Sequence, residues 1–154
     1  MPSIADRIIK LDDTTAVRLL TSVTDALQRR DENAFATEPT GDVRTAVADL
    51  ANREQAPIPK TVTDGDLART ALLVLAEDEK QARALETLLD GPPAENYTGL
   101  ELVLAAGAIL VALQTRVKII VKDGKTQLEI AKPSLSSKHL LDLARQLTAW
   151  LKAI

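Results

Sequence analysis

Apolar residues recur every three or four positions through most of residues 1–91, which is the spacing of one face of an α-helix. The pattern predicts a short opening turn and four longer helices. Gly91-Pro92-Pro93 ends the last of them, because Gly suits a left-handed cap and Pro cannot continue a helix. The runs lie around Ile4 to Leu11, after Asp12-Asp13-Thr14, from Thr40 or Asp42, after Thr63-Asp64-Gly65-Asp66, and from Asp78.

A different pattern begins at residue 98. Residues 98–114 are nearly all apolar, with Glu101 as their only charge, which predicts a buried helix over residues 100–113. Two alternating β-branched runs then flank Asp123-Gly124. A tight turn there needs positive φ, so the runs predict a β-hairpin. Pro133 closes the second run, and a serine soon after it can cap a last helix.

The predicted fold class is therefore mainly α (α+β), with an N-terminal bundle of about five helices, then the apolar helix, the β-hairpin and a C-terminal helix. We expect a helical N-terminal region (1–91), a linker (92–97) and a helix-hairpin-helix region (98–154), packed together as one globule. A chain of 154 residues with 45% hydrophobic residues is long enough to bury a core of its own.

The net charge of −3 conceals a division within the chain. Residues 1–97 hold 11 Lys/Arg and 18 Asp/Glu, a net −7, and residues 98–154 hold 8 Lys/Arg and 4 Asp/Glu, a net +4. Opposite charges of this size can attract the two halves to each other, within one chain or head-to-tail between chains. A chance distribution of charge over solvated faces explains the counts equally well.

The residues that usually carry catalysis are scarce. The chain has no cysteine, three aromatic residues and one histidine, His139, in the expected first turn of the last helix. Thiol chemistry and thiolate metal sites are excluded, and no aromatic platform for single-stranded nucleic acid can be assembled. The acidic clusters Asp12-Asp13 and Glu77-Asp78-Glu79 precede predicted helices, where capping explains them better than metal binding. We therefore predict no catalytic residue, no cofactor and no metal, and a protein that is not an enzyme.

Two features remain as candidate sites. The apolar helix over residues 100–113 has an uncharged core of about 18 Å, too short for a bilayer of about 30 Å. It is expected to be buried, to contact another helix, or to insert partly into a membrane surface. The second feature is a basic face on and around the hairpin, which is either a charged edge that deters aggregation or a partner-binding surface. Its candidate partner-binding residues are Arg116, Lys118, Lys122, Lys125, Lys132 and Lys138.

The C-terminal segment carries a resemblance. Its motifs are Leu113-Gln114-Thr115-Arg116-Val117-Lys118-Ile119, the turn Lys122-Asp123-Gly124-Lys125, Leu128-Glu129-Ile130 and Lys132-Pro133. They resemble small effector-associated adaptor or accessory proteins of bacterial conflict (antiphage) systems, mainly over the apolar helix, the hairpin and the last helix. These motifs are structural, so no functional residue is carried over. The resemblance implies recruitment of an effector without catalysis.

The expected function is a cytoplasmic protein–protein interaction module that recruits or regulates an effector, with another protein or a second copy as its partner and a homo-oligomer as its state. One alternative is a membrane-surface regulator that uses the apolar helix and the basic hairpin. Another is a small antitoxin-like regulator. Nucleic acid is disfavoured by the negative net charge. The first residues lack a basic stretch followed by an apolar run, so no secretory signal is expected.

Overall fold

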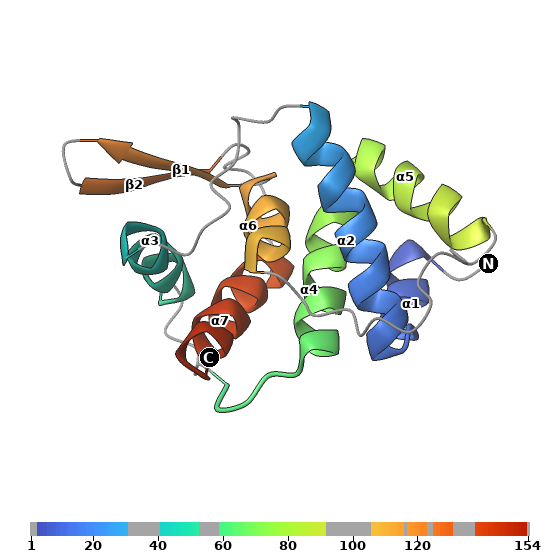
Figure 1. Cartoon of the computed structure of the whole chain (residues 1–154), viewed down its shortest axis with the longest axis horizontal. Coiled ribbons are helices and arrows are strands. Elements are labelled where there is room, and N and C mark those ends of the chain that lie inside the picture. The colour runs from blue at the N-terminus through green and yellow to red at the C-terminus, as the bar shows by residue number, and fades with distance from the viewer. Residues whose placement is uncertain are drawn as a thin grey trace.

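The computed structural model describes residues 3–30, 41–52, 59–91, 106–115, 117–122, 125–130 and 138–153. Within these ranges the chain forms seven helices and two strands, and Figure 1 shows the helices gathered on one side of the hairpin. The helices are α1 (Ile4–Ile9), α2 (Asp13–Arg30), α3 (Gly41–Ala51), α4 (Asp64–Ala76), α5 (Glu79–Asp90), α6 (Ala106–Gln114) and α7 (Lys138–Ala153).

Side-chain caps fix where several helices begin. The Ser3 hydroxyl accepts a hydrogen bond from the Asp6 N–H at 3.2 Å at the start of α1. Asp12 accepts from the Thr15 N–H at 2.9 Å before α2, and Asp78 accepts from the Lys80 N–H at 3.2 Å before α5. Each cap satisfies a backbone donor that has no partner inside its helix. The expected capping role of Asp12 and Asp78 is confirmed by these contacts.

Helix α4 lies at the centre of the molecule. It contacts α1, α2, α5, α6 and α7, and in Figure 1 it passes behind α2 and beside α7. Its buried side chains lie on several faces and include Leu67, Leu72 and Leu75, which are fully buried. Burying one leucine stabilises a fold by roughly 1.5–3 kcal/mol, so α4 contributes a large share of the core.

The two C-terminal helices complete this core. Helix α6 contacts α2 and α4, and α7 contacts α3 and α4. The buried Arg145 on α7 donates from Nε to the carbonyl oxygen of Ala51 on α3 at 3.3 Å. On the same helix, Trp150 Nε1 donates to Asp64 Oδ1 at 3.0 Å, at the start of α4. Polar contacts therefore tie α7 to two helices that are distant in sequence.

Strands β1 (Val117–Lys122) and β2 (Lys125–Ile130) pair antiparallel, with Val117 opposite Ile130 and Lys122 opposite Lys125. In the described part of the chain they form one two-stranded ladder that joins no further strand. Both strands contact α3, and Figure 1 shows the ladder reaching out to the edge of the molecule above that helix. The turn residues Asp123 and Gly124 and the closing Pro133 lie outside the described residues.

The predicted class, mainly α (α+β), is corrected by this arrangement to an α-helical fold. An α+β fold uses a sheet as a structural layer. Here the described core is built from helices, and the two strands form a single two-stranded ladder. The β-hairpin is therefore no basis for the fold class. The alternating pattern around Asp123-Gly124 reports local strand pairing only, and it does not tell whether the paired strands enter the core.

Candidate functional site

A hollow of ≈ 360 Å³ lies where the end of α1 and the residues before α4 meet α4 and α7. Its lining mixes apolar and polar side chains, so a polar ligand could bind here only if those polar groups lacked partners within the chain. The lining residues are Ile9, Pro59, Thr61, Val62, Asp66, Arg69, Thr70, Leu73 and Gln146.

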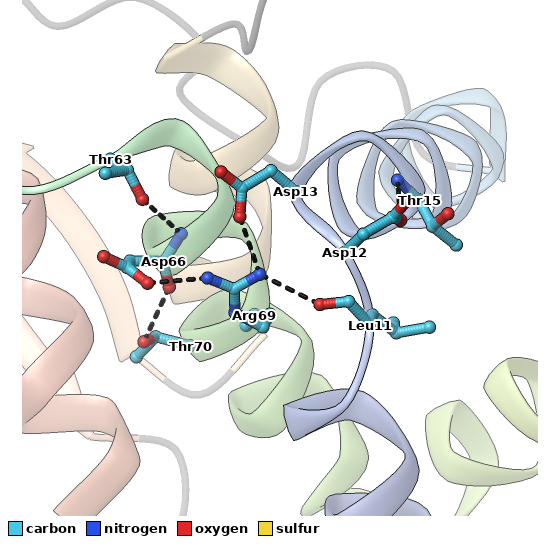
Figure 2. A network of polar contacts seen from close by, with 8 residues as sticks. All are labelled: Leu11, Asp12, Asp13, Thr15, Thr63, Asp66, Arg69 and Thr70. Atoms are coloured by element: carbon cyan, nitrogen blue, oxygen red, sulfur yellow. Dashed lines mark hydrogen bonds and ion pairs between the residues drawn. The ribbon is translucent and has the colours of Figure 1, made fainter.

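Arg69 is the centre of the polar groups beside this hollow (Figure 2). Its Nη1 donates to the Leu11 carbonyl oxygen at 3.0 Å and to Asp13 Oδ1 at 2.8 Å. Its Nη2 donates to Asp66 Oδ1 at 2.6 Å. The Thr63 hydroxyl accepts from the Asp66 N–H at 3.0 Å, so the helix cap and the guanidinium share one network.

These contacts also shift the ionisation of the groups involved. The hydrogen bond from Arg69 is the main cause that lowers the pKa of the Asp66 carboxyl, and hydrogen bonds with Thr63 lower it further. The pKa of Arg69 is raised by its two carboxylate partners, although burial acts in the opposite direction. Near this network, hydrogen bonds from Thr15 lower the pKa of Asp12.

The Arg69 network is therefore a joint between the α1–α2 corner and the start of α4. Its described donors contact this chain's own carboxylates and carbonyl, and the Arg69 side chain is only 21% exposed. A ligand at this hollow would have to displace paired charges. The carboxylates of the segment Asp64-Gly65-Asp66 have a structural role, because Asp66 pairs with Arg69 and Asp64 accepts a hydrogen bond from Trp150.

A second hollow, of ≈ 430 Å³, lies between the C-terminal half of α2 and the outer side of α5, and we call it the α2–α5 groove. Figure 1 shows α5 at the periphery of the molecule, on the side away from the hairpin. The lining residues of the groove are Ser22, Val23, Ala26, Leu27, Arg30, Lys80, Gln81, Arg83, Ala84 and Leu88.

Helix α5 is only partly covered by its neighbours. Leu85 is its one fully buried side chain, while Leu88 is 46% exposed and lines the groove. The far end of the helix is held to α1 by an ion pair between Arg7 and Asp90 at 2.8 Å. The apolar face of α5 therefore continues from the core into the floor of an open groove.

Among the described residues, three cationic side chains and no acidic one line the groove. Arg83 forms an exposed ion pair with Glu79 at 2.8 Å, one turn away on α5. Within the described ranges no ion pair is found for Lys80 or Arg30. Sequence reasoning missed this site. The pattern that could have indicated it is the position of two basic residues, Lys80 and Arg83, beside Ala84 and Leu88 on one helix.

The structure places the six predicted basic residues only in part. Arg116 and Lys132 lie outside the described residues, and Lys138 is exposed at the first position of α7. Lys118, Lys122 and Lys125 lie on the strands, where the backbone is described but the side chains are not. The register sets Lys122 opposite Lys125 and Lys118 opposite Glu129, so these four positions share one face of the ladder. The predicted basic surface stays a prediction.

The apolar helix, predicted over residues 100–113, is observed as α6 from Ala106, and residues 100–105 lie outside the described part. Side chains from Ile109 to Leu113 are fully buried against neighbouring helices. Partial membrane insertion would need this face to be exposed, so its burial counts against the membrane-surface alternative. None of the helices in the described ranges is long and apolar enough to cross a bilayer.

Other chemistry-bearing residues remain dispersed. Among the described residues, no group of three or more His, Asp or Glu side chains is placed to hold a metal ion. His139 is half-buried at the second position of α7. The α2–α5 groove is therefore the best-defined candidate binding surface.

The fit between Gly65 and Asp13 gives a test of the Arg69 joint. A Cβ at position 65 would overlap the Asp13 side chain that accepts from Arg69. Gly→Ala normally stabilises a helix by about 0.5–1 kcal/mol. Here we expect Gly65→Ala to lower the free energy of unfolding in urea. In an Asp13→Gly background, which removes the overlapping atoms, Gly65→Ala should instead be stabilising. A stabilising effect in both backgrounds would refute the joint.

The lowered pKa of Asp66 predicts a pH dependence of stability. A carboxyl whose pKa is depressed by folding contributes stability above its unfolded pKa of about 3.9, and this contribution is lost as pH falls through the folded pKa. The Asp66 side chain is 54% exposed, so solvent screening limits the effect to about 1 kcal/mol or less. We expect Asp66→Asn to destabilise the chain at pH 7 and the gap to wild type to close below about pH 4. Urea unfolding measured from pH 7 to pH 3 checks this, and a gap independent of pH would contradict it.

No family model, curated protein or solved structure matches this chain.

Proposed function

We propose that the chain is a non-enzymatic protein-interaction module that recruits or regulates a partner protein through the α2–α5 groove. The observation that carries the proposal is the incomplete covering of α5. An open groove of ≈ 430 Å³ with an apolar floor and a polar rim has the composition of a binding site rather than of a solvated helix face.

The exposure of Leu88 alone would not support this proposal, since single exposed leucines are common on protein surfaces. Ile9 is more exposed, at 60%, and lines the hollow beside Arg69. The difference lies in the surroundings. The charges beside Ile9 are paired with each other across the joint. The groove beside Leu88 is lined by cations and by no described acidic side chain, and of these cations Arg83 has an exposed ion pair, with Glu79.

The resemblance of the C-terminal segment supports an effector of a bacterial conflict system as the partner. Such effectors are intracellular, which agrees with the expected cytoplasmic location. The resemblance involves structural motifs, and it therefore supports the role of recruiter without naming the groove as the contact. The groove is the surface that contacts the effector in this proposal.

The hairpin supports a second, self-associating surface. Figure 1 places it on the opposite side of the molecule from α5, so one small partner cannot cover both. Lys118, Lys122 and Lys125 share one face of the ladder, where Lys122 lies opposite Lys125. Residues 1–97 of a second copy, with a net charge of −7, are a complementary surface for a head-to-tail oligomer.

A photo-crosslinking residue at position 88 tests recruitment in the cells that encode the chain. We expect a discrete protein adduct from position 88, because its side chain opens into the groove. The same residue at position 152, exposed on α7, is the matched control and should give no such adduct. The adduct is identified by mass spectrometry and its binding reproduced with purified proteins. Equal labelling from both positions, or none from position 88, would refute the proposal.

Charge reversal on the hairpin tests self-association. We expect Lys118→Glu combined with Lys122→Glu to abolish oligomers in sedimentation at low salt. The two introduced glutamates would repel the acidic half of a second copy, which the lysines attract. The melting temperature should stay nearly unchanged. If it falls together with the oligomer, these positions pack inside the fold. A chain that is monomeric at every concentration would contradict the homo-oligomer itself.

A further inference from the structure

The α2–α5 groove is cationic although it lies in the acidic part of the chain. Residues 1–97 carry a net charge of −7, yet the charged groups in the described lining of the groove are Arg30, Lys80 and Arg83. A local field of this sign attracts carboxylates and repels other cations within about 10 Å at ordinary salt. The charge of the groove therefore limits the chemistry of its occupant.

The walls of the groove follow helical spacing. Ser22, Ala26 and Arg30 are one turn apart along α2, and Gln81, Ala84 and Leu88 follow i, i+3, i+7 spacing along α5. The small side chains of Ser22, Ala26 and Ala84 allow a third backbone to approach closely. Two walls of this kind form a seat for a helix rather than for an extended strand, which would need an open sheet edge to pair with.

We infer that the groove binds an acidic amphipathic helix of a partner protein. Its apolar residues, spaced i, i+4, i+7, pack on Ala84 and Leu88, and carboxylates on its flanks meet Lys80, Arg83 and Arg30. Helix α5 has 12 residues, so an occupant of matching length spans about 18 Å, or three turns. The inference rests on the proposed interaction module and names the chemistry of its partner.

The existing contacts leave the cations available to such a partner. The pair between Arg83 and Glu79 is exposed on both sides, with side-chain exposures of 76% and 80%. Exposed pairs of this kind contribute little to stability, so a partner carboxylate can replace Glu79 at little cost. Lys80 has no ion pair with any described residue.

Nucleic acid fits the groove less well. The lining residues that the structure describes include no aromatic side chain to stack against a base. The apolar floor around Leu88 has no counterpart in a phosphodiester chain, whereas it matches the apolar face of a helix.

Two synthetic peptides test the inference. The first is a fluorescein-labelled amphipathic helix of about 15 residues with Leu at i, i+4, i+7 and Glu at its flanks, and the second carries Lys in place of each Glu. Fluorescence anisotropy with the full chain should show at least about tenfold tighter binding of the acidic peptide, and weaker binding as salt rises. Equal binding of the two peptides, or no binding of the acidic one, would overturn the inference.

Variants of the chain locate the contact. Lys80→Glu with Arg83→Glu should weaken binding of the acidic peptide at least about tenfold, because two attractive contacts become repulsive. Lys60→Glu with Lys152→Glu makes the same change in net charge at exposed positions outside the groove and should leave the affinity within about twofold. Leu88→Glu should remove binding while the melting temperature stays near that of wild type, since this side chain is already half exposed. Full binding by Leu88→Glu would overturn the groove as the site.

The outcomes separate this inference from the proposed function. A protein adduct from position 88, together with equal binding of the two peptides, would leave the interaction module standing and overturn its acidic partner. If the acidic peptide binds through the groove but no adduct forms in cells, the result would count against the proposed function. It would still support the preference of the groove for an acidic helix. Short duplex DNA or anionic vesicles could also displace the labelled acidic peptide. If either does so as strongly as unlabelled peptide, the inference that the partner is a helix would be overturned.

Discussion

The fold depends on the burial of α4 on several faces. A helix that presents one stripe to a core can be covered by one or two neighbours, but a helix that is apolar on most sides must be surrounded. Leu67, Leu72 and Leu75 are fully buried, and five other helices supply the cover. Small residues such as Ala68 and Ala71 let those helices approach. Because α4 must be covered on several sides, α6 and α7 pack onto it, although they follow it after a long interval of sequence.

The sequence predicted the starts of helices well, and the way in which the helices pack against one another less well. Thr63 and Asp78 predicted where α4 and α5 begin, because caps act within one turn. The uncharged run containing Ile109 predicted a buried helix, because no charge limits its burial. The α+β class was wrong, since alternation in the Val117–Lys122 run cannot tell a core layer from a projecting hairpin. The α2–α5 groove escaped prediction because periodicity shows which face of a helix is apolar and does not show how much of it a distant helix covers.

Counting charge over long segments concealed the cationic groove. Many of the described acidic residues of this half lie at helix N-termini, where Asp12 and Asp78 accept hydrogen bonds from free backbone amides. On α2 the cations Arg29 and Arg30 occupy the last turn, as the helix dipole favours. On α5, Lys80 and Arg83 lie in the first half of the helix. Two helices that lie side by side can then bring cations together even when their summed charge is negative.

The energetics of the groove favour a reversible contact. Burying the remaining exposed part of Leu88 stabilises a complex by only about 1 kcal/mol, whereas micromolar affinity requires about 8 kcal/mol. The apolar floor therefore cannot hold a partner alone, and neighbouring contacts on Ala84 and Leu27 add less than a large aromatic anchor would. The cations must supply orientation and a fast approach, which are the main effects of complementary charge at an interface. A contact built this way forms and releases quickly, which suits a chain that recruits a partner rather than one that is permanently assembled with it.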